Sequence, residues 1–315
     1  MKVTVVIPLL NEVLSLDALL HALMKQTLSP TEVILVDGGS KDGSIEKIQE
    51  WQQKKLSFNL VLLEKLGANR SVARNFGIKE ARTEVIALTD AGCKPKADWL
   101  EKLTTPFIDE ERTEVVAGFY DPAPQNWWED VLADYTCTRD WNFQPNTFLP
   151  SSRSLAITKT IWHKVGGYPE HLNTCEDLIF AEKLKNKSKH WQVVKEAQVI
   201  WNQPHNLSEL SQKIFGYATG DLQAKYERHV NKIYSAMWRI IVLICVAVPA
   251  AFIGQPIIRV FGLSFFALYI VGSLGKHPRM LKYPLAIFAI PVIQLTVDAS
   301  LVQALIYHKL SSQYK

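Results

Sequence analysis

The sequence predicts an α/β fold, a mostly parallel sheet flanked by helices, followed by transmembrane helices at the C-terminal end. Short β-branched apolar runs recur along the first 235 residues, and segments with helical periodicity alternate with them. From residue 240 to residue 307 the chain carries three long stretches that are almost free of charge. We therefore expect two domains, a sheet domain over residues 1–232 and a membrane anchor over residues 233–315.

Five apolar runs are expected to be strands that are buried on both faces. They are Val3–Ile7, Val33–Val36, Leu60–Leu63, Val85–Leu88 and Val115–Ala117. The helical patterns lie at residues 15–26, 42–53, 70–81 and 98–108. Open parallel sheets bind ligands beyond the carboxyl ends of their strands. The polar residues at those ends are therefore the candidates for a functional site.

Three apolar stretches are expected to cross a membrane. They are Ile240–Ile258, Val260–Gly275 and Tyr283–Tyr307. Each approaches the ~20 residues that a spanning helix needs, although buried core helices or a re-entrant pair are the alternative. The last stretch contains one charge, Asp298, which is costly in a membrane unless it faces a partner or water.

The charges around these stretches predict their orientation. The basic loop at residues 276–282 (KHPRMLK) is expected to stay cytoplasmic, and the uncharged connection at residues 254–256 is expected to cross. The protein is then multi-pass in the cell membrane, with its large domain cytoplasmic. Four basic residues of the segment before the first stretch suit an anionic leaflet: Lys225, Arg228, Lys232 and Arg239.

Composition excludes several classes of function. A net charge of +4 without blocks of like charge does not indicate a nucleic-acid partner. The four cysteines show no metal-ligand spacing, which favours reduced thiols in a cytosolic domain. The chain starts directly with a strand-like run, so no signal peptide is expected.

Three polar clusters follow the predicted strands. They are PLLNE at residues 8–12, DGGSKDGS at residues 37–44 and DAG at residues 90–92. The first cluster lacks the G-x-G-x-x-G loop of dinucleotide-binding folds, and it also lacks the glycine-rich basic loop expected of a nucleotidyltransferase. Carboxylates at the ends of two predicted strands indicate a site at this edge of the sheet.

Six motifs occur in the order typical of one enzyme family. They are VVIPLLNE at residues 5–12, VDGGSKDGS at 36–44, ARNFGIKEA at 73–81, TDAGCKP at 89–95, GGYPE at 166–170 and CEDLIFAEKL at 175–184. Over about residues 3–220 the sequence resembles family 2 glycosyltransferases, which have the GT-A fold. The resemblance implies transfer of a sugar from a nucleotide-diphosphate donor to an acceptor hydroxyl, with inversion at the anomeric carbon.

The resemblance implies where the donor binds. Asp37 stands where the family accepts the ring N–H of the base, and an Asx-type turn that closes the strand is the alternative. Further contacts to the donor are expected from Pro8, Asn11, Glu12, Gly39 and Ala91. The base is left open among UDP, GDP and dTDP donors.

The diphosphate needs positive charge, for which the sequence offers two arginines. Arg70 and Arg74 are separated by one helical turn and share a face of a helix that is expected to start near Asn69. A solvated helix face is the alternative for either arginine. Asn75 is expected to fix local structure.

The resemblance implies a divalent cation, Mg²⁺ or Mn²⁺, at Asp90, which begins the Asp-x-Asp element of the family. Here Gly92 occupies the third position, so one carboxylate is absent. The cation could still bind through Asp90, the phosphates and water, or Asp90 could contact the sugar instead. His205 is a second candidate for the metal or the phosphate, with capping or packing as its alternative.

The family motif places the catalytic base on Asp177, with Glu176 beside it in contact with acceptor or sugar. An acceptor hydroxyl is a weak nucleophile until a base takes its proton. The two acids begin a helical pattern, so a role as partners of the helix dipole is the alternative. The turn at residues 166–168 (GGY) is expected to bring this helix to the sheet edge.

The Q-x-x-R-W element of processive members is absent from the corresponding region, residues 212–217. This favours transfer of one sugar per encounter. The expected membrane attachment favours an acceptor at the interface: a polyprenyl phosphate, a diacylglycerol-type lipid or a lipid-linked glycan. Four tryptophans could form an acceptor platform or belong to the core: Trp127, Trp128, Trp141 and Trp162.

Three other functions compete with this interpretation. The main alternative is a non-catalytic, membrane-tethered module that binds nucleotide sugars, because Gly92 departs from the motif. A nucleotidyltransferase is disfavoured by the PLLNE loop, and a transporter by the small number of spans.

Overall fold

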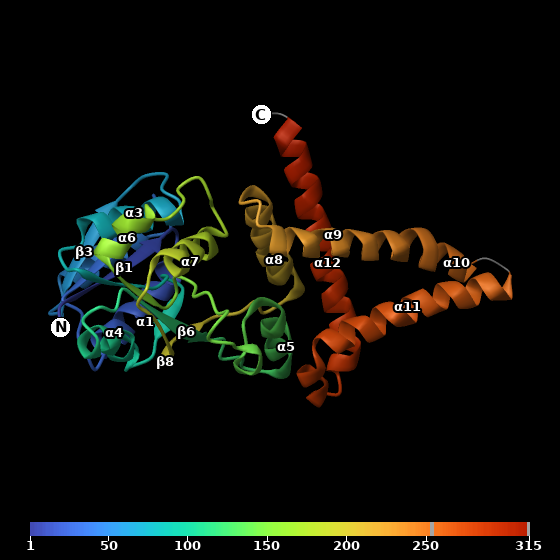
Figure 1. The fold of residues 1–315 in the computed structure, drawn as a ribbon, viewed down its shortest axis with the longest axis horizontal. Helices are drawn as coiled ribbons and strands as arrows, with labels where there is room; N and C mark the ends of the chain where they lie inside the picture. The colour runs from blue at the N-terminus through green and yellow to red at the C-terminus, as the bar shows by residue number, and fades with distance from the viewer. Residues whose placement is uncertain (253–254, 314–315) are drawn as a thin grey trace. The chain divides into compact units, whose positions relative to one another are not determined.

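The computed structural model describes residues 1–252 and 255–313, which form two compact units (Figure 1). The first unit consists of Met1–Ala123 and Phe143–Asn202, and the second consists of Pro124–Asn142 and Gln203–Lys315. The second unit therefore contains helical segments that precede the apolar stretches in the sequence. A division of function at residue 232 stays a prediction.

An eight-stranded sheet forms the centre of the first unit, in the order β3-β2-β1-β4-β7-β6-β8-β5. The strands are β1 (Val3–Leu9), β2 (Glu32–Asp37), β3 (Asn59–Glu64), β4 (Val85–Leu88), β5 (Cys93–Pro95), β6 (Val115–Asp121), β7 (Leu155–Thr158) and β8 (Trp191–Trp201). All five predicted strands are present, because each has the apolar composition of a strand buried on both faces.

Parallel pairing dominates the sheet and confirms the predicted fold class. β1 pairs in parallel with β2 and with β4, and β2 pairs in parallel with β3. Leu9 at the end of β1 lies opposite Asp37 at the end of β2, so these two strands end at the same level. β7 runs antiparallel to both β4 and β6, an arrangement that the sequence patterns did not predict.

Helices cover the sheet of the first unit. They are α1 (Val13–Met24), α2 (Ser44–Gln52), α3 (Arg70–Glu80), α4 (Trp99–Asp109), α6 (Lys159–Val165) and α7 (Glu176–Lys187). The prediction that α3 starts near Asn69 is confirmed: the Asn69 side chain caps the helix by accepting a hydrogen bond from the backbone N–H of Val72.

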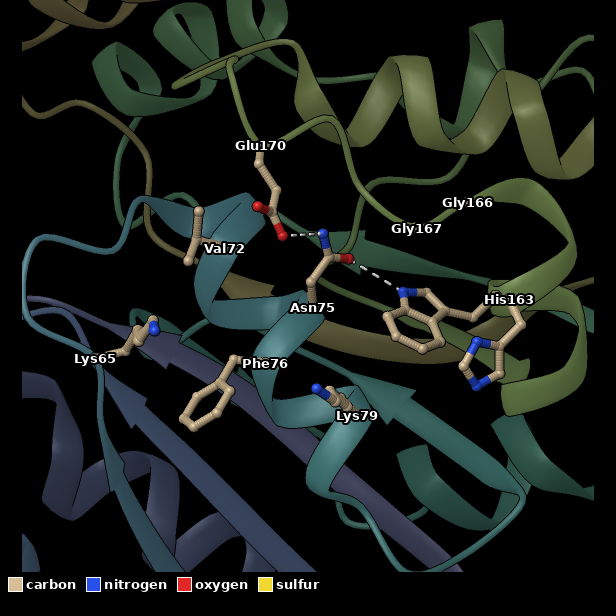
Figure 2. A pocket seen from close by; sticks show the side chains of 10 residues that line it. Lys65, Val72, Asn75, Phe76, Lys79, His163, Gly166, Gly167 and Glu170 are labelled. Atoms are coloured by element: carbon tan, nitrogen blue, oxygen red, sulfur yellow. Dashed lines mark hydrogen bonds between the residues drawn. The ribbon is translucent and has the colours of Figure 1, made fainter.

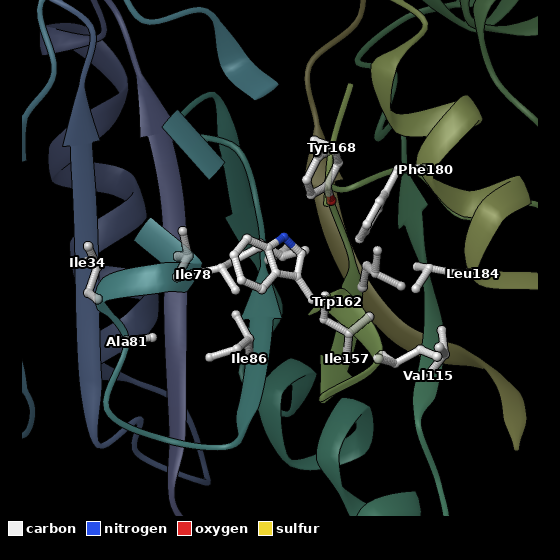
Figure 3. Close-up of a cluster of buried hydrophobic side chains, with 14 of the residues drawn as sticks. Ile34, Ile78, Ala81, Ile86, Val115, Ile157, Trp162, Tyr168, Phe180 and Leu184 are labelled. Carbon is white, nitrogen blue, oxygen red and sulfur yellow. The ribbon is translucent and has the colours of Figure 1, made fainter. Parts of the chain in front are cut away.

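A core cluster fills the space between the sheet and the helices α3, α6 and α7 (Figure 3). Ile34, Ile86 and Ile157 contribute from the strands, and Phe180 contributes from α7. Trp162 is 9% exposed in this cluster, so the core alternative holds for this tryptophan.

The second unit is entirely helical in its regular structure. Its α-helices are α5 (Trp127–Thr136), α8 (Leu207–Gln223), α9 (Glu227–Val242), α10 (Val248–Phe252), α11 (Pro256–Lys276) and α12 (Ala286–Gln313). One core cluster joins α5, α8 and α12, and Trp127 and Trp128 pack against it. A second cluster joins α8, α9 and α12 through residues such as Leu222, Ile233 and Leu305.

Within the described residues, three helical segments are long and apolar enough to cross a membrane: Val230–Ala250, Pro256–Lys276 and Ala286–Ser311. The first begins earlier than the predicted stretch, because the charged residues before Ile240 continue the same helix. The end of that predicted stretch runs through residues 253–254, which lie outside the described residues. Large apolar side chains such as Phe261 and Phe266 are exposed on these helices, which indicates membrane association.

Asp298 has a basic partner in the helical unit, as expected of a carboxylate among apolar helices. Its side chain is fully buried, and its oxygens accept hydrogen bonds from Arg239 of α9, Tyr269 of α11 and Gln294 of α12. Arg239 therefore neutralises Asp298 inside the helical unit, which corrects the expectation that it serves an anionic leaflet. The side chain of Arg228 lies outside the described residues.

Candidate functional site

The loop after β2 is organised by Asp37. Its Oδ1 accepts the backbone N–H groups of Gly39 and Ser40 at 2.7 and 2.8 Å, and its Oδ2 accepts the Ser40 hydroxyl. Asp37 has no exposed surface, so its contacts are those of the Asx-type turn considered as the alternative. Gly39 has a φ of +106°, which a glycine adopts without strain.

The loop after β1 is bound to this turn. The Asn11 backbone N–H donates to the Ser40 hydroxyl at 2.8 Å, and the Asn11 side chain accepts the N–H of Lys41 at 2.9 Å. The N–H of Glu12 donates to the Ser44 hydroxyl at 2.9 Å. Asn11 has a φ of +57°, a conformation that non-glycine residues rarely adopt and that clusters at functional sites.

A third loop, between β3 and α3, approaches the same turn. The N–H of Gly67 donates to the carbonyl of Gly38 at 2.9 Å. A Cβ at Gly38 would lie 2.8 Å from the carbonyl oxygen of Ala68, so this close approach requires glycine. The loops that follow β1, β2 and β3 therefore form one connected edge.

Arg74 of α3 connects two acidic residues that are distant in sequence. Its Nη2 donates to Asp90 at 2.7 Å, and its Nη1 donates to Glu176 at 2.8 Å. Asp90 follows β4, and Glu176 is the first residue of α7. Arg74 is 1% exposed, so its guanidinium is enclosed between the two carboxylates and cannot reach a donor phosphate. The expected direct contact between Arg74 and the diphosphate therefore changes to a positioning role.

Asp90 keeps its charge although it is largely enclosed. Burial by itself raises the pKa of a carboxyl, but Arg74, Arg153 and Arg70 favour the ionised form and lower the pKa of Asp90 to about 2. Its side chain is 23% exposed. Arg70, at the exposed start of α3, therefore acts on Asp90 through its charge, as a donor-binding residue at this edge would.

Arg153 is a residue that the sequence motifs did not identify. It precedes β7, and its Nε lies 3.7 Å from Oδ2 of Asp90. Its guanidinium carbon lies 3.8 Å from the ring centroid of Trp201 at the end of β8. The signal that could have found it is an arginine just before a strand that pairs with β4, but the antiparallel pairing was not predicted.

The acidic pair at the start of α7 follows a strained residue. Cys175 has a φ of +66°, which turns the chain into the helix at Glu176. Burial and the neighbouring Asp177 raise the pKa of Glu176, against the opposing effect of Arg74. Asp177 is half-buried, and its Oδ1 accepts the N–H of Leu178 at 2.9 Å. Of the two carboxylates, Asp177 is thus the more open to an acceptor.

The position of Gly92 is faced by a carboxylate from another loop. A Cβ at Gly92 would lie 3.9 Å from both carboxylate oxygens of Glu12. An aspartate there would bring a second negative charge against Glu12, while glycine leaves Glu12 as the neighbour of the Asp90 loop. The described residues contain no cluster of three or more His, Cys, Asp or Glu side chains suited to a metal. Mg²⁺ is often held by one or two carboxylates plus phosphates and water, so a single carboxylate at Asp90 suits a cation that the donor itself helps to bind.

His205 belongs to the second unit, where it interacts with acidic residues. Its Nδ1 lies 3.0 Å from Glu129, and its backbone N–H donates to Glu209 at 2.9 Å. These contacts precede the Asn206 cap of α8, in agreement with the capping alternative. Trp141 is 37% exposed, and the guanidinium groups of Arg139 and Arg279 lie over its ring, so its role in an acceptor platform stays a prediction.

Asn75 fixes local structure, as predicted. Its side-chain oxygen accepts a hydrogen bond from Trp162, and its amide donates to Glu170 (Figure 2). The same oxygen and amide also bond the backbone N–H and carbonyl of Tyr168. A hollow of about 410 Å³ lies beside it, between α3 and the turn at residues 166–170. Trp162 lines this hollow, but none of the residues predicted for the donor, the metal or the base does, so it is no candidate for the donor site.

Comparison with known proteins identifies the family of this chain. The model of Glycosyl transferase family 2 matches residues 4–167, just over half of the chain. Glycosyltransferase AglE of Haloferax volcanii is 33% identical over 102 residues, which are 32% of this chain and 33% of that protein. Cholesterol galactosyltransferase of Borreliella burgdorferi is 34% identical over 119 residues, which are 38% of this chain and 33% of that protein. The matches span about a third of the length of these curated relatives.

The fold is also found in a solved structure. Mannosyltransferase PcManGT from Pyrobaculum calidifontis, in complex with GDP-Man and Mn²⁺, matches with a TM-score of 0.61 and 18% identity. The match covers 98% of this chain and 86% of that one. This likeness confirms the expected GT-A-like architecture, a mostly parallel sheet flanked by helices and followed by long apolar helices.

Proposed function

The chain belongs to glycosyl transferase family 2, and we propose that it transfers one sugar from a nucleotide-diphosphate sugar to a lipid-linked acceptor, with inversion at the anomeric carbon. The observation that carries the proposal is the bridge made by Arg74, which ties Asp90 at the end of β4 to Glu176 at the start of α7. Glu176 is the neighbour of the expected base, Asp177, so the bridge supports the proposal that the donor-side acid and the base act at one edge of the sheet.

The connected loops after β1, β2 and β3 bind the nucleoside. Pro8, Asn11, Glu12 and Gly39 supply this part of the site. Asp37, which has no exposed surface, keeps the β2 loop in shape. Such preorganisation spares the enzyme the entropy of ordering loops around the donor. Arg70 and the end of β4, with Asp90 and Ala91, receive the diphosphate and the sugar.

Asp177 is the catalytic base. The acceptor oxygen attacks the anomeric carbon while Asp177 takes its proton, and the bond from that carbon to the diphosphate breaks. The nucleoside diphosphate leaves with the electron pair of that bond. Glu176 is a positioning residue in this scheme, because it is 4% exposed and holds Arg74. A hydroxyl or a phosphate of the acceptor is the nucleophile.

A divalent cation, Mg²⁺ or Mn²⁺, is part of the proposal for Asp90. When bound, such an ion neutralises charge on the leaving diphosphate. Glu12 is the carboxylate that takes the place of the missing third residue of the Asp-x-Asp element. His205 as a second ligand stays a prediction. Its partner in the described residues is Glu129.

The acceptor is lipid-linked, because a soluble donor gives an enzyme no reason to carry long apolar helices. Three such helices lie in the described chain. The basic loop before α12 keeps the catalytic domain on the cytoplasmic side of the cell membrane. Lys282 of this loop lies 3.1 Å from Asp130, so part of its charge is used within the second unit.

The test uses the full chain in detergent with labelled UDP-, GDP- and dTDP-sugars and a total membrane lipid extract. Wild type is expected to transfer label into the organic phase from one donor. Asp177→Asn is expected to lower the turnover by about 10²- to 10⁴-fold and to keep donor affinity, because only the base is lost. Asp109→Asn, at an exposed residue, is the control. If the label appeared only in water-soluble products, the proposal of a lipid-linked acceptor would be contradicted.

A second candidate, a non-catalytic module that binds nucleotide sugars, is favoured by Gly92 alone. The same experiment separates the two. Donor binding by wild type without transfer to any acceptor, in the presence of Mn²⁺, would support the module.

A further inference from the structure

We infer that Arg153 is a ligand of the donor diphosphate and supplies positive charge beside Asp90. The inference rests on the proposed function and deepens it, because it assigns the phosphate contact to a residue outside the family motifs quoted above. Four features carry it: a fixed backbone, an aromatic support, the second oxygen of Asp90, and the charges around that carboxylate.

The backbone on both sides of Arg153 is fixed by buried hydroxyls. The Ser152 hydroxyl and the Tyr168 hydroxyl are hydrogen-bonded at 2.7 Å. The Ser154 hydroxyl donates to the carbonyl of Ala197 at 2.8 Å and accepts the indole N–H of Trp99 at 2.9 Å. Ser152 and Ser154 are 1% and 2% exposed. The Cα of Arg153 is therefore held between two anchored neighbours.

The side chain of Arg153 is held by an aromatic ring. Its guanidinium carbon lies 3.8 Å from the centroid of the Trp201 ring, a favourable cation–π distance. A stacked guanidinium is restricted to the plane of the ring, and its planar fork keeps N–H groups directed along its edges. The Arg153 side chain is 16% exposed, in contrast to 1% for Arg74. Part of this preorganised cation is thus open to a ligand.

The two oxygens of Asp90 face two different arginines. Oδ1 accepts a hydrogen bond from Arg74, and Oδ2 lies 3.7 Å from Nε of Arg153. This separation is a charge contact and exceeds hydrogen-bond distance. The charge of Arg153 therefore acts on Asp90 from a short distance. A phosphate oxygen beside Asp90 would be within the same field.

The balance of charge requires a further cation here. Arg74 is neutralised by Asp90 and Glu176, and Glu12 and Asp177 add further acidic groups to this edge. A diphosphate that enters such surroundings meets repulsion unless cations face it. The element that would bring a metal to this place has Gly92 in its third position. Arg153 and Arg70 are the cations that act on Asp90 in addition to Arg74, and Arg153 is the one that packing holds in place.

The test compares the affinity of the full chain for a nucleoside diphosphate, the matching monophosphate and the nucleoside. UDP, GDP and dTDP are titrated first to find the base that binds, in EDTA and in Mn²⁺. We expect Arg153→Met to weaken diphosphate binding by about 10- to 100-fold in both conditions and to leave the nucleoside affinity unchanged, since a charge-assisted contact is lost. Arg153→Lys is expected to recover part of this loss.

Two controls separate binding from folding. Arg112→Met removes an exposed arginine of the same unit and is expected to change no affinity. The thermal midpoint of each variant reports its folding. An Arg153→Met chain that binds the nucleoside normally is folded at the site, so its diphosphate affinity is decisive.

The outcomes distinguish this inference from the proposed function. If wild type binds UDP, GDP and dTDP no better than the nucleosides, the proposed function and this inference both fail. If wild type prefers the diphosphate and Arg153→Met keeps that preference in full, the inference alone is overturned and Arg153 only neutralises Asp90.

Discussion

Two aspartates, one in each unit, are held by arginines in ways that differ in one respect. Asp90, at the end of β4, pairs with Arg74 at 2.7 Å and keeps 23% of its side chain exposed. Asp298, in α12, is fully buried and accepts hydrogen bonds from Arg239, Tyr269 and Gln294. The first carboxylate is partly exposed, and the second is sealed by its partners.

The difference shows that an aspartate–arginine pair can serve two purposes. Around Asp298 every oxygen is occupied by side chains of the helical unit, so the pair joins α9, α11 and α12. Around Asp90 one oxygen is bonded by Arg74, while the other lies near a cation that is not hydrogen-bonded to it. The sealed pair fits a structural role, and the open pair fits a ligand.

The largest effect is expected from Arg74→Met, which removes the arginine that pairs with Asp90. Removing this arginine leaves Asp90 and Glu176 enclosed without their common partner, which is expected to lower the free energy of unfolding by about 3–5 kcal/mol. Denaturant unfolding measures the loss, with Arg82→Met at an exposed site as control. If Arg74→Met unfolded with the same free energy as wild type, the bridge between Asp90 and Glu176 would not stabilise the fold.

A smaller effect is expected from Asp298→Asn, which tests the sealed pair. The change leaves Arg239 without a countercharge among apolar helices and is expected to destabilise the helical unit by about 3 kcal/mol. Helical signal on heating in detergent measures it. The nucleotide affinity of the folded fraction is expected to equal that of wild type, and a weakened affinity would contradict a purely structural role.

The smallest effect is a pH dependence specific to Asp90. Its pKa is about 2 in the folded chain, below the ordinary value of 3.8. The unfolded chain therefore binds the proton more readily, and the charged Asp90 contributes about 2 kcal/mol of stability above pH 4, which is lost as the pH falls toward 2. The difference in unfolding free energy between wild type and Asp90→Asn should shrink over that range. If the difference in unfolding free energy stayed constant between pH 4 and pH 2, the lowered pKa of Asp90 would be refuted.

The sequence predicted the part of the sheet whose strands have a simple signature. β1 to β4 and β6 contain β-branched apolar runs, and the acids and glycines that follow β1, β2 and β4 indicated the edge that we propose as the site. The full extent of β8 was not predicted, because polar residues such as Gln192, Lys195 and Glu196 interrupt its pattern. β5, Cys93–Pro95, is too short for any periodicity.

The contacts between the site residues could not be predicted for a related reason. Asp90 and Arg153 are separated by a long segment of chain, and they meet because β7 pairs antiparallel with β4. Arg74 was identified by type and spacing, but its enclosure by Asp90 and Glu176 depends on how α7 packs. Whether Asp37 shares one cleft with Asp90 and Asp177 stays a prediction, supported by the linked loops after β1 and β2.

The comparison of the two aspartates is tested most directly by one titration. The nucleotide sugar that wild type uses is titrated into the full-length wild type, Asp90→Asn and Asp298→Asn chains under the same detergent conditions. The account predicts at least a roughly 10-fold loss of affinity for Asp90→Asn and no change for Asp298→Asn. Equal affinities in all three chains, or a loss confined to Asp298→Asn, would contradict it.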